Sequence, residues 1–244
     1  MKMRNFTDQT LKVHLFDYDV SDIVANMPPD EDPIWDLDTR RQAEPVWGLG
    51  ATKSIIFKWF VDPNFDWKHS QDVDQFVDKF HMDTELWALA KPLVEQIEAH
   101  HNGVAVRAYY SKINPQSEIE RHGDGDCLLV PLVSKHIVAL ENNADELFEV
   151  DGVRESVPVG AVYEFDNISV HTRINRGLTR TVYLIVDVLP NDFQECIVSG
   201  GYGEYPVTNL YRTDRTITYT ANTETGRVDL IHNSHQKVYE PWPI

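Results

Sequence analysis

Two histidines and one aspartate are spaced so that they could ligate a single metal ion. His122 and Asp124 are separated by one residue, so in extended backbone both side chains project from the same face. His171 lies much later in the chain, at the start of another predicted strand. Two imidazoles and one carboxylate form the facial triad that holds Fe(II) and leaves adjacent coordination positions open. The pattern predicts a metal centre of His122, Asp124 and His171.

A basic residue follows His171 at a distance that suits a small diacid. If Arg176-Gly177 forms the tip of a two-residue hairpin, position 171 pairs with 182, and Arg180 shares a face with His171. Arg180 would then lie about 7 to 8 Å along the sheet from that histidine. This distance suits the distal carboxylate of a five-carbon 2-oxo acid that chelates the metal, and arginine binds carboxylates bidentately. The same register turns Val182, Leu184 and Val186 inward, and Arg173 is the rival anchor.

The elements that must position these residues are mostly strands. The chain has no alternation of strands with helices, and about eight short β segments are separated by turn formers. We therefore predict a mainly β fold with flanking helices around a double-stranded β-helix, the jelly-roll or cupin-like core. The predicted strands are 54–60, 104–113, 127–133, 136–141, 146–150, 161–165, 169–174 and 179–188.

Helical periodicity is confined to residues 70–100. Val73, Phe76, Val77 and Phe80 are spaced as one face of an amphipathic helix. A second apolar stripe follows the cap signal Asp83-Thr84, and within it Pro92 should kink the helix or mark a restart. Two helices are expected there.

The chain is expected to form one domain with three parts. Residues 1–103 form an irregular and helical N-terminal region packed on the core, 104–190 the double-stranded β-helix, and 191–244 a C-terminal extension. The alternating Thr216, Thr218 and Thr220 suggest a hairpin in that extension.

Composition excludes several classes of partner. The 244 residues include 22 Lys+Arg against 39 Asp+Glu, a formal charge of −17, which disfavours nucleic acids and anionic membrane surfaces. Two cysteines and the lack of an apolar leader or a membrane-length apolar stretch favour a soluble cytoplasmic protein. Phosphate-binding loops of the Gly-x4-Gly-Lys type and Gly-x-Ser-x-Gly elbows are also lacking, so neither nucleotide hydrolysis nor serine hydrolase chemistry has support.

Several motifs together carry a family resemblance over residues 104–190. They are the lead-in Ile113-Asn114-Pro115-Gln116-Ser117-Glu118-Ile119-Glu120-Arg121-His122, the His-x-Asp pair, Asp166-Asn167 before His171, and Asn175-x-Gly177-x-x-Arg180. In these features the chain resembles the aspartyl/asparaginyl β-hydroxylase-like branch of the Fe(II)/2-oxoglutarate-dependent dioxygenases. The resemblance implies iron on the predicted triad and the 2-oxoglutarate tail on Arg180. It also implies that the Ser111 hydroxyl lines the co-substrate pocket, with Ile113 beside it.

The resemblance also implies an activity. It implies hydroxylation of an amino acid or of a peptide or protein side chain, with Fe(II), 2-oxoglutarate and ascorbate as reductant, and with succinate and CO2 as co-products. Some members carry Arg-x-His after the first metal ligands, where this chain has Leu128-Leu129-Val130. Asp124 argues against halogenation, because halogenases vacate that ligand position. The alternatives are a cupin-like metal- or sugar-binding module or isomerase without oxygen chemistry, and a degenerate barrel with a structural role.

Other residues compete for roles in the site. Asp126 has the strand parity of Asp124 and is the rival carboxylate, and His136 competes with His171 as the distal ligand. Arg107, Tyr109 and Arg121 could line the mouth of the barrel. Four other histidines have simpler explanations: His100 and His101 suit the end of a helix, and His232 and His235 suit the surface.

Overall fold

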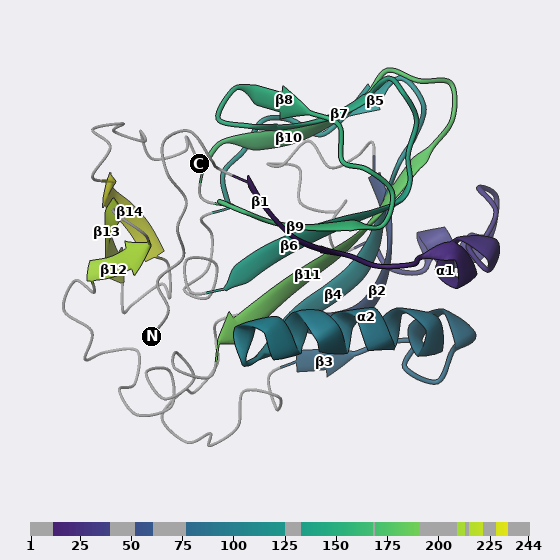
Figure 1. Ribbon diagram of the computed structural model, residues 1–244, viewed down its shortest axis with the longest axis horizontal. Coiled ribbons are helices and arrows are strands. Elements are labelled where there is room, and N and C mark those ends of the chain that lie inside the picture. The colour runs from purple at the N-terminus through teal and green to yellow at the C-terminus, as the bar shows by residue number, and fades with distance from the viewer. Residues whose placement is uncertain are drawn as a thin grey trace.

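Two antiparallel sheets face each other in the computed structural model, which describes residues 12–39, 52–60, 77–124, 133–167 and 169–190, and the backbone of 209–212, 215–221 and 228–233 (Figure 1). The larger sheet has the strand order β1-β9-β6-β11-β4-β2-β3. Its strands are β1 (Lys12–Asp17), β2 (Thr52–Phe60), β3 (Val77–Lys79), β4 (Gly103–Ile113), β6 (Ser134–Glu141), β9 (Ala161–Phe165) and β11 (Thr181–Pro190). The smaller sheet has the order β5-β10-β7-β8, formed by β5 (Ser117–Glu118), β7 (Glu146–Val150), β8 (Val153–Glu155) and β10 (His171–Asn175).

The order of the strands defines the fold class. From β4 to β11 the chain passes repeatedly between the two sheets, so that β4, β6, β9 and β11 lie in one and β5, β7, β8 and β10 in the other. This is the winding of a double-stranded β-helix, and it confirms the predicted jelly-roll core. The extra strands β1, β2 and β3 extend the larger sheet at its two edges.

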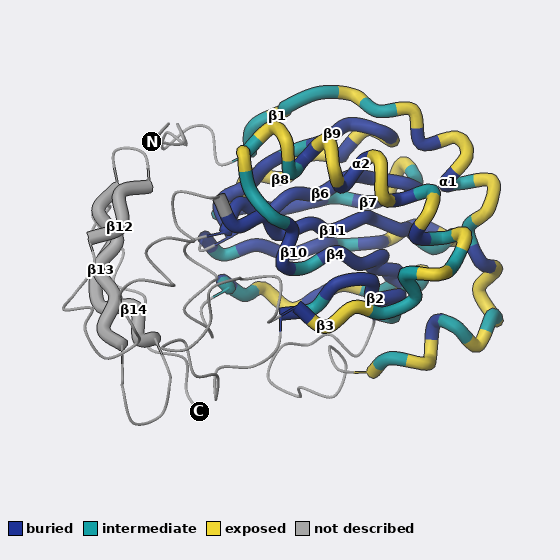
Figure 2. Tube along the Cα trace, turned by 90° about the horizontal axis from the view of Figure 1, so that it is seen from below, coloured by how far each residue is buried: buried dark blue, intermediate teal, exposed yellow. Residues whose placement is uncertain are grey.

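Alternation along the strands of the larger sheet creates two separate apolar layers. Even-numbered residues of β11, from Val182 to Val188, pack with buried residues of α2 (Glu85–His101) on the outer face. Tyr183 and Ile185, also on β11, pack with residues of β7 between the two sheets. Figure 2 shows these strands as the most deeply buried part of the described chain. The inner layer is therefore the only one that borders the barrel interior.

Helix α2 covers the outer face of the larger sheet (Figure 1). Its N-cap is Thr84, whose side-chain oxygen accepts a hydrogen bond from the backbone N–H of Trp87 at 3.3 Å. The helix ends at Asn102, which adopts a left-handed conformation with φ of 46°. Gly103 follows, where a Cβ atom would lie 2.5 Å from the carbonyl oxygen of Leu189, so only glycine fits this junction. The helix continues through Pro92, so the predicted restart does not occur.

The prediction of the first helix, which begins at residue 70, is wrong over the part of it that the structure describes. Val77–Lys79 is a strand that pairs with Lys58–Phe60 of β2, and residues 61–76 lie outside the described residues. Four apolar residues at helical spacing are a weak signal, and the open edge of β2 satisfies the backbone of this segment by pairing.

The flanking regions contain regular structure. Residues 12–39 include β1, the short helix α1 (Ser21–Ala25) and the 3-10 helix η1 (Pro33–Asp36), which holds the fully buried Trp35. The C-terminal region forms a three-stranded antiparallel sheet of β12 (Asn209–Arg212), β13 (Arg215–Ala221) and β14 (Val228–Asn233). The alternating threonines lie in β13, which pairs antiparallel with β12 from Arg212 opposite Arg215 onward, as expected of a hairpin. Among the described residues no helix is long and apolar enough to span a membrane.

Candidate metal centre

Backbone pairing brings His122 and His171 together. The two residues form an antiparallel bridge, with the N–H of His122 3.1 Å from the carbonyl oxygen of His171 and the reciprocal hydrogen bond at 2.7 Å. The ring centroids are 4.5 Å apart. Nδ1 of His122 lies 2.8 Å from the carbonyl oxygen of Glu120, and Nδ1 of His171 lies 2.9 Å from that of Ser169. Each Nδ1–H can therefore donate to a carbonyl, which leaves the Nε2 lone pair for a metal ion.

Asp124 completes the group. Its backbone N–H donates to the carbonyl oxygen of Asn167 at 2.8 Å, which fixes the segment beside His171. Its Oδ1 atom is 3.7 Å from Nε2 of His122 and 3.8 Å from Nε2 of His171. The potential ligand atoms of the three residues all lie within 4.8 Å of one another. The structure thus places the three sequence-predicted ligands around one point.

Lys135 holds the other carboxylate oxygen of Asp124. Its ammonium group donates to Oδ2 at 2.6 Å, and the Asn167 side-chain amide lies 3.4 Å from the same oxygen. Lys135 is a buried cation on β6 that faces the space between the sheets, and it belongs to none of the motifs recognised in the sequence. The only signal in the sequence is its alternation with the apolar residues Ile137 and Ala139 of the inner layer.

Burial and charge set the protonation states of the site. Burial alone would raise the pKa of Asp124, but the positive charge of Lys135, together with the neighbouring imidazoles, outweighs burial and holds this pKa well below its usual range. Burial is the largest influence on His171 and lowers its pKa to about 3. At neutral pH the aspartate is therefore ionised and His171 is neutral, which are the states that bind a metal. For Lys135, burial favours the neutral amine, but Asp124 and Asp187 outweigh it and raise the pKa.

The donor set fits a divalent transition metal. Two imidazole nitrogens and one carboxylate oxygen converge from paired segments, and three ligands of an octahedral ion leave three positions for other molecules. The neighbouring side chains are apolar or charged groups of the inner layer, among them Phe165, whose ring centroid is 5.0 Å from that of His171. The arrangement can hold a metal ion that faces the interior of the barrel.

Arg180 lies away from this centre, and the hairpin that would have brought it there does not form. β10 pairs with β5 and β7, whereas β11 pairs with β4 and β6, so the two strands belong to different sheets. Residues 176–180 cross from one sheet to the other. The pairing of position 171 with 182, which a hairpin would give, therefore does not occur, and Arg180 does not share a face with His171. Val182, Leu184 and Val186 of β11 accordingly face α2 rather than the metal centre.

The guanidinium of Arg180 is held on the outer face of the sheet. Nε and Nη2 donate to the two carboxylate oxygens of Glu141 at 2.6 and 2.8 Å, and Nη1 donates to the carbonyl oxygen of Pro28 at 2.7 Å. The group also lies 5.8 Å from the ring centroid of Trp35. Arg180 thus connects the N-terminal region to the sheet.

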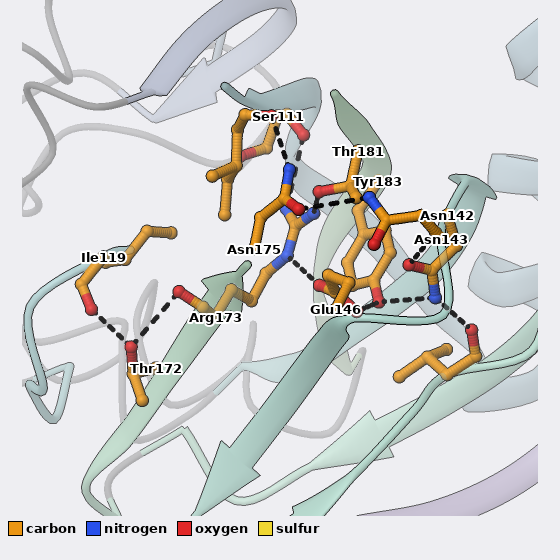
Figure 3. Close-up of polar contacts among 12 residues, drawn as sticks. Ser111, Ile119, Asn142, Asn143, Glu146, Thr172, Arg173, Asn175, Thr181 and Tyr183 are labelled. Atoms are coloured by element: carbon orange, nitrogen blue, oxygen red, sulfur yellow. Dashed lines mark hydrogen bonds and ion pairs between the residues drawn. The ribbon is translucent and has the colours of Figure 1, made fainter. Parts of the chain in front are cut away.

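Arg173, the rival basic residue, is two residues from His171 in β10 and therefore lies on the same face of that strand. Figure 3 shows Arg173 among its polar partners. Its Nε donates to Glu146 at 3.2 Å, its Nη1 to the carbonyl oxygen of Ser111 at 3.3 Å, and its Nη2 to the hydroxyl of Thr181 at 3.1 Å. The guanidinium stacks 3.5 Å from the ring centroid of Tyr183, whose hydroxyl donates to Glu146 at 2.6 Å. Period-two alternation from His171 already indicated this shared face.

The other residues that the sequence suggested for the site lie partly inside the barrel and partly outside it. Ser111 is buried next to Arg173, and Arg107 lies 3.6 Å from Asp187 and 4.9 Å from the ring centroid of Trp59, in the inner layer. Arg121 instead pairs with Glu149. Asp126 lies outside the described residues, so the structure does not test Asp126 as an alternative to Asp124 for the carboxylate ligand. His136 does not approach His171, because it projects from the opposite face of β6, toward α2.

Comparisons with known proteins find similarity to solved structures only. No protein-family model matches the chain, and no curated protein matches it. The chain is similar to a 2OG-Fe(II) oxygenase family oxidoreductase from Burkholderia pseudomallei, with 11% identity over 57% of this chain and 67% of that chain and a TM-score of 0.38. It is also similar to a predicted oxalate decarboxylase from Thermotoga maritima, with 24% identity, coverage of 38% and 72%, and a TM-score of 0.29. A cupin domain from Bordetella pertussis has 18% identity, coverage of 35% and 82%, and a TM-score of 0.28. These similarities concern the fold alone.

Proposed function

We propose that this chain is an Fe(II)/2-oxoglutarate-dependent oxygenase that hydroxylates an amino acid or a peptide or protein side chain. The convergence of His122, Asp124 and His171 on the inner side of a double-stranded β-helix carries the proposal. The aspartate is ionised and His171 is neutral at neutral pH, as metal binding requires.

The protein's own groups would orient the metal and limit access of water to it. Carbonyl acceptors at Glu120 and Ser169 fix the imidazole rings, and Lys135 fixes the carboxylate of Asp124. With 2-oxoglutarate bound, the metal would supply oxygen activation coupled to decarboxylation of that co-substrate to succinate and CO2. The apolar residues of the inner layer would exclude water from the reacting groups.

Arg173, rather than Arg180, is the anchor that we propose for the distal carboxylate of 2-oxoglutarate. Arg173 is two residues from His171 on one strand face, a separation of about 6.6 Å that suits a five-carbon diacid. A guanidinium has five N–H donors in a planar fork, so Arg173 can bind a second carboxylate while it retains Glu146. Ser111, expected to line the same pocket, is adjacent to it.

The proposed function is tested by the turnover of 2-oxoglutarate. Purified protein with iron and ascorbate should release succinate, with more release when a pool of amino acids or peptides contains the substrate. Arg173→Ala should raise the apparent constant for 2-oxoglutarate by roughly two to three decades. Arg180→Ala, the matched control, should leave that constant within a factor of about two, because its guanidinium lies on the outer face.

Two outcomes would contradict these assignments. A large effect of Arg180→Ala with little effect of Arg173→Ala would return the anchor to Arg180. Because Arg173 is buried, its alanine variant is to be compared with Arg173→Lys, and iron binding is measured on both to show that the centre is folded. Intact iron binding without any use of 2-oxoglutarate would refute the oxygenase proposal.

One observation favours a second candidate, a cupin-like metal-binding module or isomerase without oxygen chemistry. Among the described residues of β11, those that share the inner face with Tyr183 and Ile185 offer no cation, and the nearby Arg173 already pairs with the fully buried Glu146. A barrel of this kind would bind the metal and leave 2-oxoglutarate unchanged. The turnover assay therefore separates the two candidates.

A further inference from the structure

A second group of potential metal ligands lies on the outer face of the larger sheet, beneath the last turn of α2. His101 comes from that turn, His136 from β6 and Glu164 from β9. His136 and Glu164 are direct partners in the β6–β9 register, so their side chains leave the sheet side by side. α2 crosses this face (Figure 1), and its final turn brings His101 over the pair.

The potential ligand atoms of these residues converge as those of the first centre do. Nε2 of His136 is 2.7 Å from Nε2 of His101, and Nε2 of His101 is 3.8 Å from Oε2 of Glu164. All three ligand atoms lie within 4.8 Å of one another. A zinc ion with bonds of about 2.0 to 2.1 Å separates two imidazole nitrogens by about 3.3 Å in tetrahedral geometry. A displacement of His101 by a fraction of an ångström would therefore accommodate the ion.

Hydrogen bonds orient the rings for this role. Nδ1 of His136 lies 3.0 Å from the carbonyl oxygen of Val186, to which it can donate, so the Nε2 lone pair of the neutral ring points toward His101. Nδ1 of His101 lies 3.4 Å from the hydroxyl of Ser134, which can accept in the same way. Metal-binding histidines commonly donate their second ring N–H to such an acceptor. The two Nε2 atoms so close together need either a shared proton or a cation between them.

We propose that His101, His136 and Glu164 bind a divalent metal of the zinc class, with water as a fourth ligand, and that this metal fastens the end of α2 to the sheet. Two imidazoles and a carboxylate form a known zinc ligand set. The side chains of His101 and Glu164 are only 12% and 7% exposed, and His136 is fully buried. Side chains buried to this degree are closed to a substrate, so the role that we assign to the metal is structural.

The second site is separate from the first. Lys135, which binds Asp124, and His136 are consecutive residues of β6 and therefore project from opposite faces of the sheet. Each group of ligands can consequently be removed without a direct change to the other. The structural-metal proposal does not depend on the oxygenase proposal.

The experiment measures zinc on protein in which the first centre is disabled. In an Asp124→Ala background, stripped with a chelator and then given Zn2+, we expect about one equivalent of bound zinc. Zinc at about 100 times its dissociation constant should raise the melting temperature by about 5 to 10 °C. Co2+ in place of zinc should give the visible absorption of a low-coordinate site.

Two variants and a neighbouring control make the test specific. Glu164→Gln keeps the size of the side chain, and His101→Asn changes a residue at the end of the helix, so both variants should fold. Both should lose the zinc-dependent rise in melting temperature. His100→Asn, a change at the exposed neighbouring position, should keep the zinc-dependent rise in melting temperature. An unchanged zinc content in both variants would overturn the proposal. Equal melting temperatures of the Asp124→Ala protein with and without zinc would also overturn it, and would leave the cluster as a proton-sharing histidine pair.

Discussion

At the scale of single residues, the iron-binding capacity of the proposed centre depends on the two histidines. We expect His122→Ala or His171→Ala to abolish tight Fe(II) binding, because two remaining ligands hold a labile divalent ion poorly. Iron stoichiometry on folded protein checks this, with the exposed His14→Ala as the control. Normal iron content in both variants would show that the triad is misassigned.

Asp124 has two separable effects, one on metal binding and one on stability. Asp124→Ala should eliminate hydroxylation, whereas Asp126→Ala should leave most of it. The first change also removes the carboxylate that is hydrogen-bonded to the buried Lys135, and breaking a buried ion pair typically costs about 3 to 5 kcal/mol in free energy of unfolding. The double variant Asp124→Ala/Lys135→Met should recover much of that stability without metal binding, as measured by denaturant unfolding and iron content. If Asp126→Ala has the stronger effect on activity, the ligand is Asp126.

At the scale of the elements, Arg180 belongs to the contact between the N-terminal region and the larger sheet. Arg180→Ala removes two hydrogen bonds to Glu141, one to Pro28 and one to Asp30. We expect a loss of about 1 to 3 kcal/mol in free energy of unfolding, which chemical denaturation can measure. Lys53→Ala, which removes an exposed pair with Asp36, is the control and should change stability by less than about 1 kcal/mol. A fully stable Arg180→Ala protein would contradict this structural role.

The β7–β8 hairpin should weaken in acid because of Glu149. Burial alone would raise the pKa of Glu149, but hydrogen bonds from Arg154 and Arg121 outweigh burial and hold this pKa below its usual value. A lowered folded-state pKa means that the ionised group contributes stability above the unfolded pKa of about 4.3, and that this contribution is lost as the pH falls through the folded value.

The variant Glu149→Gln tests this pH dependence. It should be less stable than the wild type at pH 7. The difference in melting temperature should begin to shrink below about pH 4.3, where the unfolded chain takes up the proton, and it should disappear once the pH has fallen through the lower folded-state pKa. If the difference in melting temperature between the two proteins stays constant from pH 7 to 3, the ion pairs of Glu149 contribute nothing to stability.

At the scale of the whole molecule, α2 and the sheets should unfold together. Leu93 is fully buried in the layer between α2 and the larger sheet. Leu93→Ala should therefore cost about 2 to 5 kcal/mol in free energy of unfolding, with one transition for helix and sheet. The exposed Lys91→Ala on the same helix is the control. Separate transitions by helix and aromatic probes would show that α2 is an independent unit.

Features that depend on local spacing could be predicted from the amino-acid sequence. Period-two alternation and turn residues located seven of the predicted strands to within a few residues, while the eighth, 127–133, falls mostly outside the described residues. His122 and Asp124 could be paired because one intervening residue fixes their relation along the chain. The cap at Thr84 and the apolar stripe likewise located α2, since these signals lie within a few residues of the structure they predict.

The tertiary structure alone decided which strands pair. The segment from His171 to Arg180 is equally compatible with a hairpin and with a crossover between sheets, because the deciding hydrogen bonds come from β4, β6 and β7, far away in the sequence. That choice places Arg173 inside the barrel and Arg180 outside it. In the same way, His101, His136 and Glu164 meet only because α2 packs over the β6–β9 pair, a contact between distant segments that no local pattern encodes.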